Sequence, residues 1–260
     1  MGQLKKTLAL FKAAHPWCCF CGGKSATTTV DHVPNRAFFR NRDWPEGYEF
    51  PSCGRCNAKS RLTELIVSAL ARSAPARTAQ DFHEVVDLYT HWARRDRRSF
   101  EEFVGPLSPS GLLVFPASVR VQIARRRPGE MNIGQRLNKH LSAYAEKLLK
   151  ALYYKHASII VPSVAEVTPV IVSNGQIGEP HELELRKLKF PGQPTLVRCS
   201  NSKTAPPLNE QFHYSYGIDP SGGIAVFKVR LNESFLIAGV VDPKGALPLS
   251  AAADLGISPR

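Results

Sequence analysis

Six cysteines are the residues of this sequence whose spacing points most directly to chemistry. Cys18 and Cys21 form one C-x2-C pair, Cys53 and Cys56 form a second, and residues 22–52 separate the two pairs. Two such turns allow four thiolates to close tetrahedrally on one zinc ion. Close pairs crowded into the first quarter of a chain favour a metal site over a disulfide framework. We therefore expect a structural zinc ion on these four thiolates.

The other two cysteines are expected to stay outside the zinc site. Cys19 would have to replace Cys18 in an unusually tight C-x-C turn, so we expect it to be a spectator. Cys199 lies in a strand-like segment, where a free cysteine behaves as a small buried apolar residue.

A second set of polar residues lies between and beside the two cysteine pairs. Residues 27–33 read Thr-Thr-Thr-Val-Asp-His-Val and are followed by proline, which predicts a short strand ending near Asp31 and His32. A second short strand at 48–50 leads into the distal cysteine pair, where Asn57 opens a helix with periodic apolar residues. This order of elements predicts a hairpin whose Asp-His pair faces the start of the helix.

These motifs resemble the HNH endonucleases, which share a ββα-metal nuclease fold. The resemblance rests on C-x2-C, Val-Asp-His-Val-Pro and Cys-x2-Cys-Asn-x-Lys, in that order, over residues 15–70. It implies that His32 is the general base that activates water. It also implies that Asp31 and Asn57 hold a divalent ion, magnesium, against the scissile phosphate of DNA. The chain departs from the family at Tyr48, where the family usually has an asparagine.

Elementary chemistry agrees with this assignment. An imidazole has a pKa suited to taking a proton from water near neutral pH. A hard cation neutralises charge on a phosphate and prefers oxygen ligands, which Asp31 and Asn57 would supply. The structural alternatives stay open at this point. His32 would then merely cap the hairpin, while Asp31 and Asn57 would serve as turn and N-cap residues.

The charge balance indicates the kind of partner. Lys and Arg total 34 and Asp and Glu total 22, a formal net charge of +12. A cationic surface releases condensed counterions when it binds phosphate, so we expect DNA as the partner, with RNA the less favoured polyanion. Glu64 lies two helical turns after Asn57 on the same face, where it could join the metal shell or pair with an arginine, and we expect the arginine pair. Several cations lie near these motifs in sequence: Lys24, Arg36, Arg40, Arg42, Arg55, Lys59 and Arg61.

Length and composition exclude other classes of protein. The chain has 260 residues, of which 43% are hydrophobic, which argues against disorder along its length. No apolar run approaches the roughly 20 residues that a membrane span needs. The N-terminus lacks the apolar core of a signal peptide. We therefore expect a cytoplasmic protein.

The expected fold class is α+β. We expect an HNH-like ββα-metal module with structural zinc over residues 1–72 and an α+β domain of unassigned role over 73–260. Within that domain, 73–156 is expected to be helical and 158–242 rich in antiparallel strands. The helices predicted there include 78–92 and a long one over 133–152. The predicted strands are 170–172, 183–188, 196–199, 212–216, 224–231 and 235–241.

The sequence thus predicts a metal-dependent, HNH-like endonuclease acting on DNA. The alternative is a catalytically inactive, zinc-stabilised nucleic-acid-binding protein, for which Tyr48 is the main indication. The role of the C-terminal region (substrate selection, dimer contact or partner binding) and the oligomeric state stay open.

Overall fold

The computed structural model describes residues 2–72, 78–104, 134–173, 188–200, 208–220, 223–232 and 234–245. The helices in these ranges are α1 (Gly2–Ala14), α2 (Gly54–Ala71), α3 (Ala79–Arg95), α4 (Arg97–Val104) and α6 (Gln135–Ala157). The strands are β1 (Thr29–His32), β2 (Glu49–Ser52), β3 (Glu166–Ser173), β4 (Thr195–Arg198), β5 (Phe212–Ile218), β6 (Ala225–Leu231) and β7 (Phe235–Asp242).

The described helices follow the sequence signals. Thr78 is the N-cap of α3, and its hydroxyl accepts a hydrogen bond from the Asp81 amide at 3.1 Å. This contact satisfies one of the amides left unpaired at a helix start. The predicted long helix is α6, which buries a stripe of apolar side chains that includes Leu141, Leu148 and Leu152. These two helix predictions are confirmed, and the α+β class with them.

The C-terminal strands form one antiparallel sheet in the order β3-β7-β6-β5-β4. Five of the six predicted strands are present in it with shifted ends. For example, β3 runs over Glu166–Ser173 rather than only 170–172. The sixth, at 183–188, lies outside the described residues except for Leu188. Neighbours in sequence from β5 to β7 pair directly, as short connections favour.

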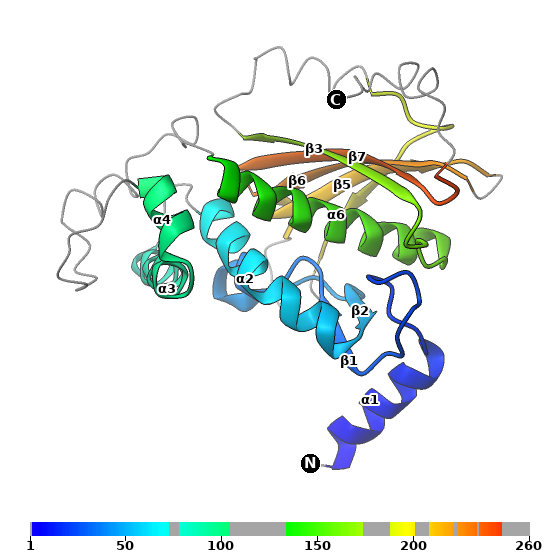
Figure 1. Cartoon of the computed structure of the whole chain (residues 1–260), viewed down its shortest axis with the longest axis horizontal. Helices are drawn as coiled ribbons and strands as arrows, with labels where there is room; N and C mark the ends of the chain where they lie inside the picture. Colours follow the sequence, from blue (N-terminus) through cyan, green and yellow to red (C-terminus); the bar gives the residue numbers. More distant parts are fainter. Residues whose placement is uncertain are drawn as a thin grey trace.

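Helix α6 lies along one face of this sheet and contacts β3 and β7 (Figure 1). Gly239 in β7 allows the close approach, because a Cβ atom there would lie 2.4 Å from Cδ1 of Leu149 on α6. On its other side, α6 contacts α2, the helix that follows the small hairpin of β1 and β2 (Figure 1). One set of buried apolar side chains runs without a break from Phe50 in the hairpin to Phe227 in the sheet. The two stretches of chain expected as separate domains therefore share a core.

Helix α1 extends away from the body beyond the hairpin (Figure 1). None of the helices in the described part of the chain has the length and apolar character that crossing a bilayer requires.

Candidate functional site

The four cysteines expected to bind zinc come together in the structure. The Sγ atoms of Cys18, Cys21, Cys53 and Cys56 all lie within 4.8 Å of one another. Thiolates bound to a tetrahedral zinc ion at about 2.3 Å lie about 3.8 Å apart, so this group can hold a metal ion such as zinc. Cys19 is buried and, as expected, is not a member of the group.

Two backbone turns position these thiols. The first is the loop between α1 and β1, closed by a bridge between Trp17 and Ala26. The second is the start of α2, where Cys53 is the N-cap residue and its Sγ accepts a hydrogen bond from the Cys56 amide at 3.4 Å. An amide directed at sulfur favours the thiolate form that a metal ion needs.

The first turn also packs against the chain that follows α6. Gly22 has a φ of +69°, and a Cβ atom at this position would lie 2.5 Å from the backbone nitrogen of Ser163. Only glycine fits both the left-handed backbone and this close approach. The first turn of the thiol cluster is therefore seated on the segment between α6 and β3.

Strand, strand and helix follow one another in the predicted order. β1 and β2 pair antiparallel, with Asp31 opposite Phe50 and His32 opposite Glu49, and α2 begins just after β2. The thiol cluster ties the end of β2 and the start of α2 to the loop that precedes β1. It thereby holds together the three elements that carry the candidate residues.

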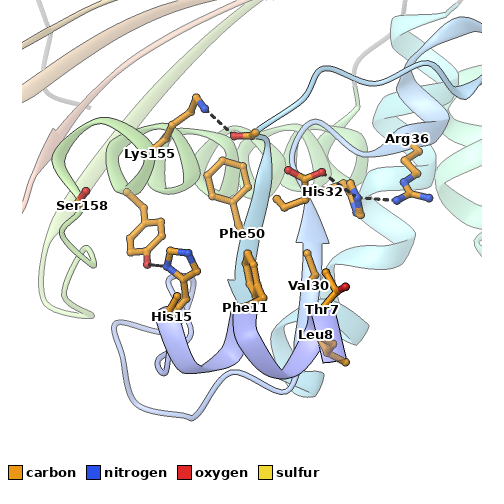
Figure 2. A pocket seen from close by; sticks show the side chains of 14 residues that line it. Thr7, Leu8, Phe11, His15, Val30, His32, Arg36, Phe50, Lys155 and Ser158 are labelled. Carbon is orange, nitrogen blue, oxygen red and sulfur yellow. Dashed lines mark hydrogen bonds and ion pairs between the residues drawn. The ribbon is translucent and has the colours of Figure 1, made fainter. Parts of the chain in front are cut away.

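His32 lies at the tip of β1 and faces an open cavity of about 1130 Å³ (Figure 2). Its side chain is 21% exposed. The cavity is formed between α1, the hairpin and the end of α6, and Arg36, Lys155 and Phe11 also line it. A phosphate group beside His32 would meet its imidazole and the guanidinium of Arg36, with the Glu49 carboxylate near them, while Lys155 lies on another part of the cavity wall (Figure 2).

The contacts of His32 favour its neutral form. Its Nε2 atom lies 2.9 Å from Nη2 of Arg36 and 3.9 Å from Oε1 of Glu49. A guanidinium has only donors, so Nε2 is the acceptor and carries a lone pair. Burial, followed by the charge of Arg36, lowers the pKa of His32 against the opposing effect of Glu49 and Asp31. The neutral imidazole is the form that acts as a base.

Asp31 faces the opposite side of the hairpin, because successive strand residues point to opposite faces. Its carboxylate is buried, and Oδ2 accepts a hydrogen bond from Nζ of Lys147 on α6 at 2.6 Å. The same ammonium donates to Oγ of Ser60 at 2.8 Å and pairs with the carboxylate of Glu64. The expectation that Glu64 pairs with an arginine is therefore wrong, because its partner is Lys147 on α6.

Asn57 lies in the first turn of α2, on the Asp31 side of the hairpin. Its Nδ2 atom approaches Oγ1 of Thr29 at 3.5 Å, and Thr29 shares a strand face with Asp31. The structure thus brings Asn57 to the side of Asp31 and leaves His32 on the other. A fixed ammonium, rather than open space, adjoins the Asp31 carboxylate, so this arrangement does not fit a magnesium ion. The role of Asp31 and Asn57 as magnesium ligands stays a prediction.

Sequence reasoning missed Lys147. Its helix shows a clear apolar stripe, and Lys147 directly precedes Leu148, a residue of that stripe. A lysine at the edge of a buried stripe signals that its ammonium needs an acidic partner. The pattern does not identify Asp31, which lies 116 residues earlier in the chain.

We compared the chain with protein families, curated proteins and solved structures. No family model, curated protein or solved structure matches this chain.

Proposed function

We propose that this protein is a nuclease that hydrolyses phosphodiester bonds in DNA, with His32 as the general base. The position of His32 carries the proposal: a half-buried imidazole, whose Nε2 accepts a hydrogen bond from Arg36, faces an open cavity lined by Arg36 and Lys155. The thiol cluster holds the hairpin that presents it. The net charge of +12 supports a polyanionic substrate.

In the proposed step, Nε2 of His32 accepts a proton from a water molecule. The water oxygen forms a bond to phosphorus, the bond from phosphorus to the leaving sugar oxygen breaks, and that oxygen takes a proton from solvent. Arg36 moves its hydrogen bond from Nε2 to a phosphate oxygen, which frees the base and neutralises charge. Lys155, whose Nζ donates to the Gly47 carbonyl at 2.7 Å, adds positive charge to the wall of the same cavity.

No step in this proposal passes through a divalent ion. The resemblance to HNH endonucleases assigns such an ion to Asp31 and Asn57. The Lys147 ammonium beside Asp31 supplies positive charge at that place instead.

The second candidate is a zinc-stabilised nucleic-acid-binding protein without catalysis. The contact between Asp31 and Lys147 favours it, because the carboxylate that the resemblance requires is already neutralised. This candidate predicts DNA binding that weakens steeply with salt and no turnover with any divalent ion.

Plasmid nicking separates the two candidates. Supercoiled DNA is incubated with the wild type, with His32→Ala and with His83→Ala, each with and without Mg²⁺. His83 is an exposed histidine on α3, so its substitution is a matched control. Loss of a general base alone slows the rate by roughly 10²–10⁴-fold, which we expect for His32→Ala only.

Equal nicking by the wild type and His32→Ala removes His32 from the mechanism. Salt-sensitive DNA binding without nicking by the wild type, in any buffer, supports the binding protein instead. Parallel reactions on single-stranded DNA and on RNA assign the substrate.

A further inference from the structure

Lys147 is held by a complete set of oxygen acceptors. An ammonium has three N–H donors, and here Asp31, Ser60 and Glu64 take one each. The side chains of Lys147, Asp31 and Glu64 are only 10%, 7% and 12% exposed. The Phe20 ring, which lies between Cys18 and Cys21 in the sequence, covers another side of the ammonium, with its centroid 4.9 Å from Nζ. The ammonium is therefore enclosed rather than free to swing into solvent.

The same oxygen atoms are also suitable ligands for a divalent cation. Mg²⁺ and Mn²⁺ prefer carboxylate, hydroxyl and water oxygens. Ser60 is fixed in the acceptor orientation because its own hydroxyl donates to the Asn57 carbonyl at 3.1 Å. Burial lowers the pKa of Lys147, but Asp31 and Glu64 outweigh this effect and raise it, so the lysine stays charged.

A cavity lies beside these acceptors, and a buried hydroxyl without a hydrogen-bond partner among the described residues lines it. This cavity of about 190 Å³ adjoins Lys147 and Glu64, and Tyr144 on α6 lines it as well. Tyr144 is 1% exposed, and its hydroxyl has no hydrogen-bond partner among the described residues. A volume of this size has room for several water molecules. The surroundings could thus complete the hydration of a cation if Lys147 were not there.

We propose that the Lys147 ammonium is the resident cation of the site formed by Asp31, Ser60 and Glu64, in the place of a divalent ion. The wild-type protein then binds no divalent ion at Asp31. Removal of the ammonium converts the site into one that binds a divalent ion. A consequence that rests on the proposed function is that DNA hydrolysis by His32 needs no added divalent ion.

Direct Mn²⁺ binding tests the site without relying on activity. Zinc-loaded protein is titrated with Mn²⁺ and followed by electron paramagnetic resonance, since a hard ion does not displace zinc from thiolates. We expect no saturable site in the wild type and about one Mn²⁺ per chain in Lys147→Met. Lys147→Met/Glu64→Gln should lose that site again. Lys150→Met, which removes a lysine that lines the same cavity, should bind no Mn²⁺.

Two results would overturn the proposal. One is a saturable Mn²⁺ site in the wild type that Asp31→Asn abolishes, a measurement that holds even if Lys147→Met does not fold. The other is a folded Lys147→Met protein that binds no Mn²⁺.

The nicking assay in Mg²⁺-free buffer tests the consequence separately. The wild type should cleave equally with and without Mg²⁺, and a strict requirement for Mg²⁺ contradicts the consequence. Absence of cleavage under all conditions overturns the proposed function, while the Mn²⁺ titration still decides the identity of the resident cation.

Discussion

The hydroxyl groups of Tyr48 and Tyr214 lie 3.0 Å apart and join the N-terminal hairpin to the C-terminal sheet. Both side chains are buried, so both hydroxyls require partners. The thiol of Cys199 donates to Tyr48 at 3.2 Å, and Nε2 of His156 lies 2.7 Å from the Tyr214 hydroxyl. Tyr48, which departs from the HNH pattern, thus connects two parts of this fold.

Removal of the Tyr48 hydroxyl should weaken that connection. We expect Tyr48→Phe to lower the free energy of unfolding by about 1–2 kcal/mol, because it leaves buried partners less well satisfied. Urea denaturation measures the change. Tyr216→Phe is the matched control, since its hydroxyl makes no hydrogen bond among the described residues and it stacks on His156 through its ring. Equal effects of the two substitutions would contradict the bridging role.

His156 should make stability depend on pH. Burial, followed by the charge of Lys155, lowers the pKa of His156 from 6.5 to about 4. The unfolded chain therefore binds more protons between these values, so stability is complete above pH 6.5 and falls as the pH drops towards 4. We expect a loss of about 2 kcal/mol between pH 7 and pH 5 from this group.

Urea denaturation of the wild type and of His156→Gln at both pH values isolates this contribution. The variant should be less sensitive to acid than the wild type. An identical pH dependence in the two proteins would assign the acid sensitivity to other groups.

The thiol cluster should be required for folding of the hairpin unit. Purified protein should contain about one zinc ion per chain, and Cys53→Ser should lose it together with several kcal/mol of stability, because metal binding and folding are linked. Elemental analysis and thermal denaturation measure both effects. Cys199→Ser, a buried cysteine outside the cluster, should keep its zinc. A stable wild-type protein that contains no metal would rule the site out.

Two lysines on α6 should differ sharply in their importance for stability. Lys147→Met leaves the Asp31 and Glu64 carboxylates buried without a counter-charge, which costs about 3–5 kcal/mol. Lys150 pairs at 2.5 Å with Glu146, whose side chain is 48% exposed, so Lys150→Met should cost less than about 1 kcal/mol. Urea denaturation at neutral pH gives both values. Similar costs would show that Lys147 is not the buried counter-ion of the hairpin.

Local sequence patterns were sufficient where a single element carries the information. The cysteine pairs were predicted correctly because two short turns determine the positions of their thiols. The cap at Thr78 and the apolar stripe of α6 identified helices because each follows the geometry of one helix. Alternation along β1 likewise implies that Asp31 and His32 point to opposite faces. In the structure Asn57 approaches Thr29, on the Asp31 face of β1, and His32 lines the open cavity.

The sequence by itself therefore determined which four thiols come together in a group that can hold a metal ion, the order of strand, strand and helix, the basic charge and the α+β class. Only the tertiary structure decided that Lys147 lies against Asp31 and that Tyr48 meets Tyr214. These partners lie 116 and 166 residues apart in the chain. The physical reason is that periodicity and capping act within one element. Contacts between distant elements depend on how all the apolar faces are buried together, and only the packed chain reveals which polar groups then meet.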